Sequence, residues 1–216
     1  MTPFTRLRAI ACPLPYSSID TDQLIPARFM KRSRAEGYGD FLLHDLRFDE
    51  AGALVSDFPL NAVNARRAEI LVTRRNFGAG SSREAAVYAL VDYGIRCVIA
   101  PSFGDIFASN AVNNGLLPAR VTEAEAEALI EGLTAGGRDL LVDLEARRIE
   151  AAGRAIDFAV EPVWRTKLLN GWDDLDLTAS YGEAIAAFAA QDRALRPWAT
   201  PAAIANDFFI EQDMSD

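Results

Sequence analysis

The sequence predicts an α/β domain built on a mixed sheet or barrel, and two observations indicate this class. Between residues 68 and 121, short apolar runs alternate with stretches whose apolar side chains recur at helical spacing, as in strand–helix–strand units. From residue 139 to 160 the apolar side chains recur at every second position, which is typical of antiparallel strands joined by turns. One globular domain over residues 1–196 with a tail over 197–216 is therefore expected.

Each expected element has local signals of its own. Two apolar runs, 68–73 and 96–100, are expected to be buried strands, and Pro101 ends the second. Residues 82–93 have helical spacing, and Gly94 stands where a glycine typically ends a helix. The other expected elements are a helix over 102–115, a strand over 117–121, a helix over 122–132 capped by Thr122, paired strands over 139–160, and helices over 162–170 and 181–195.

Composition excludes several classes of function. With 31 acidic against 22 basic residues, the formal net charge of −9 argues against nucleic-acid binding, which needs a basic surface. No apolar stretch reaches the roughly 18 residues of a membrane span, and the N-terminal residues lack the apolar core of a secretory signal. A cytoplasmic protein is expected.

The cysteines and the histidine argue against a metal site in this chain. Cys12 and Cys97 are far apart in the sequence, so free thiols in a reducing compartment are expected rather than a disulfide framework. Two cysteines and the single His44 are too few for the usual zinc or iron–sulfur ligand sets. No metal is therefore expected on this chain.

The segment NFGAGSSR, residues 76–83, joins an expected strand to an expected helix and indicates an anion site. Gly78 and Gly80 permit positive φ angles and a close approach of the backbone to a ligand. The unpaired N–H groups and the positive dipole end of the following helix favour anions in the same space. Arg83 can bind a carboxylate through two parallel hydrogen bonds, and Ser81 lies at the centre of the segment.

Other interpretations of this segment have to be weighed beside the anion site. Ser81 or Ser82 could simply cap the helix, with Glu84 complementing its dipole, and this interpretation stays open. A dinucleotide-binding loop would have glycine in place of Arg83 and an acidic residue after the next strand. The lysine of a P-loop and the G-x-S-x-G frame of a nucleophile elbow are also missing.

Residues 76–118 closely resemble the small subunits of 3-isopropylmalate dehydratase, which belong to the aconitase superfamily. The block DTDQLIP at residues 20–26 and its continuation to residue 48 resemble the same family, in the same order and spacing. The resemblance covers roughly residues 19–187. It implies an aconitase-type swivelling domain, a β/β/α barrel with a mixed sheet and flanking helices. It also implies a hydro-lyase of leucine biosynthesis that interconverts 2- and 3-isopropylmalate by dehydration and rehydration.

The resemblance also implies roles for residues and a partner. Ser81 would be the catalytic base and Arg83 the clamp on a carboxylate of a small dicarboxylate substrate, with Gly80 and Ser82 contributing to binding. The superfamily removes the hydroxyl group with a 4Fe–4S cluster that has one open iron. The resemblance therefore implies that this cluster lies on a large subunit, that the present chain binds no cofactor, and that it is active only with that partner.

A basic segment precedes the anion site in the sequence. Its cations could belong to a solvated loop that pairs with nearby acidic residues, or to a loop that closes over a dicarboxylate. The resemblance implies a flexible loop that contributes to substrate choice, and we expect residues 28–38 to be mobile without the partner. The four cations are Arg28, Lys31, Arg32 and Arg34.

Three further polar residues are expected to have structural roles. Asp20 and Asp22 could shape the site, but turn formation is the favoured interpretation. His44 is expected to be packed or hydrogen bonded rather than catalytic.

The chain departs from the family pattern at two positions in the motif. The family usually has cysteine where this chain has Ala79 and histidine where it has Ala85. These changes leave the substrate open, so a paralogous dehydratase for 2-methylmalate (citraconate) or of the homoaconitate type is an alternative. A non-catalytic scaffold subunit is another, but the retained Ser81 and Arg83 argue against it.

Overall fold

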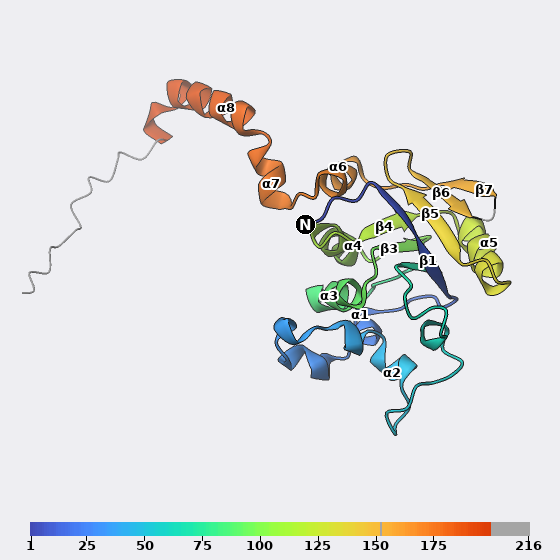
Figure 1. The fold of residues 1–216 in the computed structure, drawn as a ribbon. Helices are drawn as coiled ribbons and strands as arrows, with labels where there is room; N and C mark the ends of the chain where they lie inside the picture. Colours follow the sequence, from blue (N-terminus) through green and yellow to red (C-terminus); the bar gives the residue numbers. More distant parts are fainter. Residues whose placement is uncertain (152, 200–216) are drawn as a thin grey trace, which may run out of the picture. The chain divides into compact units, whose positions relative to one another are not determined.

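The computed structural model describes residues 1–151 and 153–199 (Figure 1). Contacts divide the chain into two units, Met1–Leu175 and Asp176–Asp216. The first unit contains the whole sheet. The expected division into a domain over 1–196 and a tail over 197–216 stays a prediction, because most of that tail lies outside the described residues.

A seven-stranded mixed sheet forms the centre of the first unit, in the order β4-β3-β2-β1-β5-β6-β7 (Figure 1). The central strand β1 is parallel to β2 and antiparallel to β5, with Ala11 opposite Ile70 and Arg8 opposite Leu141. Parallel pairing continues to β4, and antiparallel pairing continues to β7. The strands are β1 (Arg6–Leu14), β2 (Ile70–Thr73), β3 (Cys97–Ala100), β4 (Leu117–Arg120), β5 (Asp139–Asp143), β6 (Arg148–Ala151) and β7 (Arg154–Asp157).

The two edges of this sheet approach each other. Ala159, just beyond β7, pairs with Arg120 of β4, and the two backbones exchange N–H to carbonyl hydrogen bonds of 2.8 and 3.0 Å. A sheet whose first and last strands meet through such a bridge is curled toward a barrel. The expected α/β class with a mixed sheet is therefore confirmed, in the form of a curled half-barrel with flanking helices.

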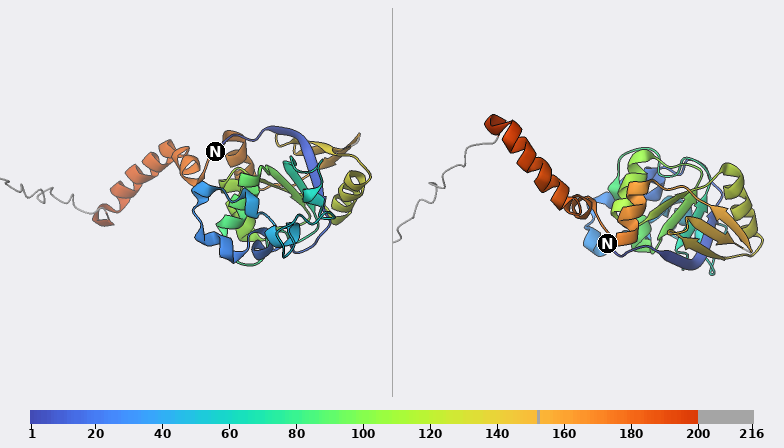
Figure 2. Two further views of the ribbon diagram at one scale, coloured as in Figure 1. Left: turned by 60° about the horizontal axis from the view of Figure 1, so that its bottom comes forward. Right: turned by 90° about the horizontal axis from the view of Figure 1, so that it is seen from above.

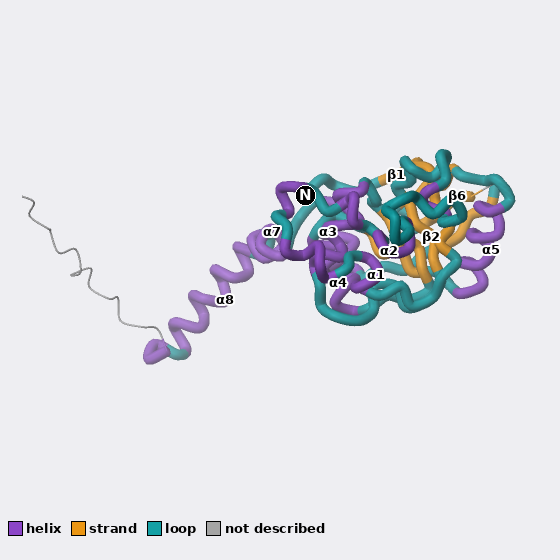
Figure 3. Tube along the Cα trace, turned by 90° about the horizontal axis from the view of Figure 1, so that it is seen from below, coloured by secondary structure: helices purple, strands orange, loops and turns teal. Residues whose placement is uncertain are grey.

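Both faces of the parallel strands are buried, which explains their uninterrupted apolar sequences. On one face, Leu71 and Val98 pack with α3 (Glu84–Tyr93) and with the loop-rich segment that contains α1 (Thr21–Leu24) and α2 (His44–Arg47). Figure 3 shows α1, α2 and their loops in front of the strands. On the other face, Ile70 and Ile99 pack with α5 (Glu123–Thr134) and α6 (Pro162–Asn170), and Figure 2 shows α5 beside the sheet.

Most of the expected elements are present with small shifts at their ends. Thr122 caps α5 through a reciprocal capping box with Glu125, as expected, and α6 has the expected bounds. α3 begins at Glu84, two residues later than expected, and α4 is the shorter span Asp105–Asn113. The strands β5, β6 and β7 occupy the expected antiparallel region.

The sequence interpretation missed the central strand β1. Its sequence RLRAIACPL has small residues of weak strand preference and contains Pro13, which argues against a central strand. The strand forms because Cys12 and Leu14 bury one face while Ala9 and Ala11 bury the other. Tertiary packing therefore outweighs local preference here.

The boundary between the two units falls within the short helix α7 (Asp174–Ala179). Within the described residues, the second unit contains residues 176–179 of α7 and the longer helix α8 (Gly182–Leu195). The helix expected over 181–195 is thus present. A 3-10 turn follows at Pro197–Ala199. Within residues 1–151 and 153–199, no helix has the length and apolar character needed to cross a membrane.

Candidate active site

The segment 76–83 lies at the carboxyl end of β2, in the parallel half of the sheet. The chain leaving β1 and the chain leaving β3 emerge at the same edge, because β1, β2 and β3 are parallel. In open α/β sheets, ligands bind at this edge of the strands. The fold therefore places the glycine–serine segment where a ligand site is expected.

The chain that leaves β1 fixes one side of this segment. The Gly78 N–H donates to the Ile19 carbonyl at 2.7 Å, and the Thr21 N–H donates to the Ala79 carbonyl at 2.9 Å. The Thr21 hydroxyl donates to the Ser81 carbonyl at 3.0 Å. The two sequence blocks that resemble the dehydratase family, 20–26 and 76–83, are therefore neighbours in the fold.

The chain that leaves β3 fixes the other side. The Phe77 N–H donates to the Ser102 carbonyl at 3.0 Å, and the Gly104 N–H donates to the Phe77 carbonyl at 2.9 Å. Gly78 has a φ of +71°, and a Cβ on it would lie 2.2 Å from Cγ of Phe107. Only glycine fits at this position, because the positive φ and the contact with Phe107 each exclude a side chain.

Ser81 and Ser82 are exposed at the surface of this fixed segment. The N-cap residue of α3 is Arg83, and no side chain caps that helix. The interpretation of either serine as a helix cap is therefore wrong. The Ser81 hydroxyl makes no hydrogen bond within the described part of the chain, and the first N–H groups of α3 lack a side-chain partner.

Arg83 is largely buried and points toward Asp22, to which its Nη1 donates a hydrogen bond; the side chains are 21% and 56% exposed. Asp20 caps α1 in a reciprocal box with Gln23, which agrees with the structural role expected for Asp20. Asp22 has a different role from the expected one, because it pairs with the arginine of the candidate site. Thr21 was not expected to belong to the site, and only its position between two aspartates could have indicated it.

A polar chain leads away from the site along α3. Glu84, next to Arg83, accepts a hydrogen bond from Asn114 at 3.0 Å. Burial, and then Glu84, raise the pKa of Tyr88. The Arg34 guanidinium lies 3.6 Å from the centre of the Tyr88 ring, so α3 connects the site to the basic segment.

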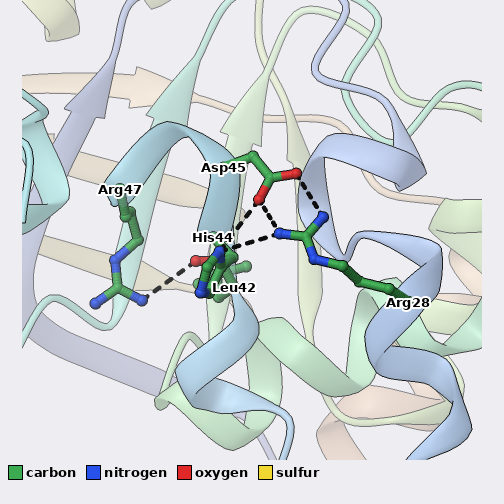
Figure 4. Close-up of polar contacts among 5 residues, drawn as sticks. All are labelled: Arg28, Leu42, His44, Asp45 and Arg47. Atoms are coloured by element: carbon green, nitrogen blue, oxygen red, sulfur yellow. Dashed lines mark hydrogen bonds and ion pairs between the residues drawn. The ribbon is translucent and has the colours of Figure 1, made fainter. Parts of the chain in front are cut away.

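Side chains anchor the basic segment near its start. The Arg28 guanidinium pairs with the Asp45 carboxylate and lies 3.3 Å from Nδ1 of His44, as Figure 4 shows. The pKa of Asp45 is lowered to about 2, chiefly by the hydrogen bonds from Arg28 and less by His44. His44 therefore has the hydrogen-bonded role expected for it. In the same view, Nη1 of Arg47 donates to the Leu42 carbonyl at 3.2 Å.

The far end of the segment is also fixed. Tyr38 is buried, its N–H donates to Asp92 of α3 at 3.0 Å, and its hydroxyl donates to the Arg32 carbonyl at 2.8 Å. Arg32 lies 5.2 Å from the ring centre of Phe41 and 3.8 Å from Glu36. Three 3-10 turns form the segment: Ala27–Lys31, Arg34–Glu36 and Gly39–Phe41.

Three of the four cations of this segment therefore contact carboxylates or rings of the chain itself. Lys31 is the fourth, and it is exposed and makes no ion pair within the described residues. Both interpretations of the segment keep some support, since its cations pair with neighbours and yet lie at the surface. Its expected mobility without a partner stays a prediction.

The two positions that depart from the family pattern lie on either side of the serines. Ala79 is half-buried and pairs with Asp20 in a short parallel bridge, while Ala85 packs partly against the core beneath α3. Cys12 and Cys97 are free, as expected, and both are buried. Burial raises the pKa of the Cys12 thiol to about 12. In the described part of the chain, no three His, Cys, Asp or Glu side chains could hold a metal ion together.

Residues 1–124 match the family model of the aconitase C-terminal domain. The chain is 49% identical over 201 residues to the 3-isopropylmalate dehydratase small subunit of Rhodospirillum centenum, covering 92% of this chain and 99% of that one. It is 45% identical over 200 residues to the subunit of the same name from Dinoroseobacter shibae, covering 92% and 100%.

A solved structure shares the fold. The crystal structure of 3-isopropylmalate dehydratase from Methanocaldococcus jannaschii superposes with a TM-score of 0.61 and covers 84% of this chain and 98% of that one. At 24% sequence identity, this likeness concerns the fold alone.

Proposed function

Because the chain belongs to the family of 3-isopropylmalate dehydratase small subunits, with the aconitase C-terminal domain, we propose that it is one half of a two-subunit hydro-lyase. The reaction is the interconversion of 2-isopropylmalate and 3-isopropylmalate in leucine biosynthesis. The observation that carries the proposal is the segment at the carboxyl end of β2, whose backbone is fixed on both sides while Ser81 is exposed and Arg83 lies beside it.

Arg83 binds a carboxylate of the substrate. Asp22 accepts a hydrogen bond from Nη1 of the guanidinium, which leaves the Nε and Nη2 side of the fork for two parallel hydrogen bonds to a second carboxylate. The start of α3 adds its N–H groups and its positive dipole end. Gly80, with a φ of +101°, and Ser82 complete this surface and contribute to binding.

Ser81 moves the proton. Its alkoxide takes the proton α to a carboxylate, the C–H electron pair forms the alkene, and the hydroxyl on the adjacent carbon leaves. A hydroxide ion then adds to the carbon that lost the proton, and Ser81 returns its proton to the other carbon, which restores the alkoxide. A free alcohol is a poor base at neutral pH, so this step relies on the Arg83 cation and the N–H groups of α3 to stabilise the alkoxide.

A hydroxyl group leaves slowly without a Lewis acid. No three potential metal ligands converge in the described residues, so the residues of this chain do not fit such a group. We therefore assign the Lewis acid, a 4Fe–4S cluster, to a large subunit. The basic segment with Lys31 at its surface is proposed to attract the dicarboxylate and to contribute to the choice of substrate.

The test is turnover after mixing the chain with the anaerobically reconstituted large subunit from the same organism. Ser81→Ala is compared with Ser82→Ala, because both serines are exposed and neither caps α3. We expect Ser81→Ala to lower kcat by about 1,000-fold, as for loss of a general base. Ser82→Ala should mainly raise KM, and neither change should alter thermal unfolding.

Ultraviolet absorbance of the alkene product is followed for 3-isopropylmalate, 2-methylmalate and citrate. Turnover of only 2-methylmalate or citrate would show that the chain belongs to a paralogous dehydratase with another substrate. Ala79 and Ala85, which depart from the family pattern, are the reason for testing this alternative. A stable complex with an intact cluster but no turnover on any of the three would move the chain to the scaffold class. Equal kcat for Ser81→Ala and the wild type would remove Ser81 as the base.

A further inference from the structure

Thr21, the first residue of α1, is a buried polar residue that contacts the candidate site. It is only 2% exposed, and its hydroxyl donates a hydrogen bond to the Ser81 carbonyl at 3.0 Å. A hydroxyl is costly to bury unless it is hydrogen bonded. Valine has the same shape and would be buried here at a lower cost, so the hydroxyl of Thr21 indicates a specific use.

Helix α1 does not need this hydroxyl. The Asp20 carboxylate accepts a hydrogen bond from the Gln23 N–H at 2.7 Å, and the Gln23 side chain accepts one from the Asp20 N–H at 3.0 Å. The Ile25 N–H donates to the Thr21 carbonyl at 3.1 Å and closes the short helix. Because these bonds are complete without the Thr21 side chain, its hydroxyl serves the glycine–serine segment rather than its own helix.

Thr21 holds this segment on both sides of Gly80. Its N–H donates to the Ala79 carbonyl at 2.9 Å, and its hydroxyl donates to the Ser81 carbonyl. A Cβ added to Gly80 would lie 3.4 Å from Oγ1 of Thr21, so the threonine also covers the glycine. Glycine has the most conformational freedom of all residues. The contacts of Thr21 therefore fix the part of the backbone that leads into Ser81.

The Ser81 carbonyl has a second donor, the Arg83 N–H, at 2.8 Å. A carbonyl oxygen has two lone pairs, and these two donors occupy both of them. Loss of the Thr21 hydroxyl would leave the carbonyl hydrogen bonded to Arg83, so no buried group would lose its only partner and the segment would still fold. The peptide group between Ser81 and Ser82 would, however, be free to change its orientation.

The direction of the Ser81 side chain depends on its backbone alone. The side chain is exposed and makes no hydrogen bond within the described residues. A base must lie in hydrogen-bond reach of the proton that it removes, and a displacement of about 1 Å can cost roughly 100-fold in rate. Resting on the proposed function, we infer that Thr21 is a positioning residue, whose hydroxyl holds the Ser81 backbone so that the base faces the reacting carbon.

The test separates the hydroxyl of Thr21 from its methyl group. Thr21→Val keeps the shape and removes the hydroxyl, whereas Thr21→Ser keeps the hydroxyl and removes the buried methyl group. Thr73→Val is the matched control, because Thr73 is fully buried and its hydroxyl donates to the Tyr16 carbonyl, outside the segment, also at 3.0 Å. Steady-state kinetics with a saturating amount of the reconstituted large subunit and thermal unfolding of the free chain are measured for each variant.

The two Thr21 variants should show opposite patterns. We expect Thr21→Val to lower kcat about 30-fold, with KM within about threefold of the wild type and little change in the unfolding temperature. Thr21→Ser should keep kcat within about threefold of the wild type but unfold at a lower temperature, because it leaves a small cavity. Thr73→Val should keep the wild-type kcat. A stable variant that loses turnover and a less stable one that keeps it exclude a general loss of folding.

Several results would overturn the inference. Wild-type kcat in Thr21→Val would remove the positioning role alone, because Ser81-dependent turnover would persist. An unfolding temperature of Thr21→Val below that of Thr21→Ser would mean that the hydroxyl only stabilises the fold. Recovery of kcat with more large subunit would mean that Thr21 supports association instead. Absence of wild-type turnover on every substrate tested would remove the proposed function and this inference together.

Discussion

The glycine–serine segment 76–83 was expected to bind a carboxylate, and the basic segment 27–41 was expected to be either a solvated loop or a loop that closes over substrate. The structure fixes the two segments by different means. Backbone hydrogen bonds hold the glycine–serine segment on both sides. Ile19 and Thr21 make them on one side, and Ser102 and Gly104 make them on the other. Side chains hold the second, through ion pairs and ring contacts near its two ends. The first is a rigid platform, whereas the second can be released by exchanging a few partners.

This difference suits the proposed roles. A base and a carboxylate clamp must keep fixed positions relative to the reacting atoms, because a small misplacement costs much of the rate. A surface that attracts a dicarboxylate gains from exposed cations whose pairing partners are also exposed and weakly bound. Substitutions in the first segment should therefore cost stability or turnover, and those in the second should cost much less.

The largest effect is expected from Gly78→Ala. Its φ of +71° strains an alanine, and its Cβ would lie 2.2 Å from Cγ of Phe107. Together these should lower the free energy of unfolding by about 3 kcal/mol or more. The control is Gly94→Ala, whose φ of +110° is also positive but whose Cβ would have nothing within 4 Å; about 1 kcal/mol is expected. Urea unfolding measures both, and equal losses would contradict the packing argument.

A smaller effect, on turnover alone, is expected from Arg83→Lys. Lysine keeps the charge but cannot offer the two parallel donors of a guanidinium, so kcat/KM should fall about 30-fold, mainly through KM. Arg75→Lys is the matched control, because Arg75 is exposed and lies 3.8 Å from Glu123 in an ion pair outside the segment. An unchanged KM for Arg83→Lys, measured by steady-state kinetics, would argue that Arg83 serves only to hold Asp22.

Much of the parallel half of the sheet could be predicted from the sequence, because its strands are buried on both faces and read as continuous apolar runs. The capping box of α5 and the proline start of α6 were equally local signals. β1 could not be predicted, since its small residues and Pro13 carry little preference and only the contacts with β2 and β5 define it. Its burial on both faces comes from distant residues.

At the candidate site, the sequence indicated the segment but not the contacts of its side chains. Gly78 and Gly80 were noted as residues that permit positive φ, and both adopt it in the structure. The pairing of Asp22 with Arg83 joins residues 61 positions apart, which no local pattern encodes. The same holds for Arg34, whose contact with Tyr88 depends on how the basic segment crosses α3.

In the basic segment, Arg34→Ala should cost about 1 kcal/mol of unfolding free energy, because exposed cation–π contacts are of this size. It should also raise the pKa of Tyr88 further, since Arg34 opposes the rise that burial and Glu84 cause. Tyrosine absorbance titration of the variant, with Tyr88→Phe to identify the signal, measures this. Arg32→Ala is the control, because Arg32 contacts Phe41 instead, and an equal shift in both variants would contradict the assignment.

The smallest effect concerns pH and the anchor between Arg28 and Asp45. The pKa of Asp45 is lowered from 3.8 to about 2, first by the hydrogen bonds from Arg28 and then by those from His44. A carboxyl group with a lowered folded pKa stabilises the fold above its unfolded pKa, and this contribution is lost as the pH falls toward the folded value. The contribution of this anchor should therefore be complete above about pH 5 and decline between about pH 4 and pH 2.

Comparing the wild type with Arg28→Gln isolates this contribution, because the variant lacks the guanidinium cation at every pH. The difference in unfolding free energy between the two proteins should be small, since both side chains are 54% exposed, and it should disappear as the pH approaches 2. Urea unfolding at pH 6, 4 and 3 measures it, with Arg47→Gln as a control that contacts a carbonyl rather than Asp45. A difference that persists at pH 3 as strongly as at pH 6 would mean that Arg28 anchors the segment through its 4.5 Å contact with the Phe29 ring instead.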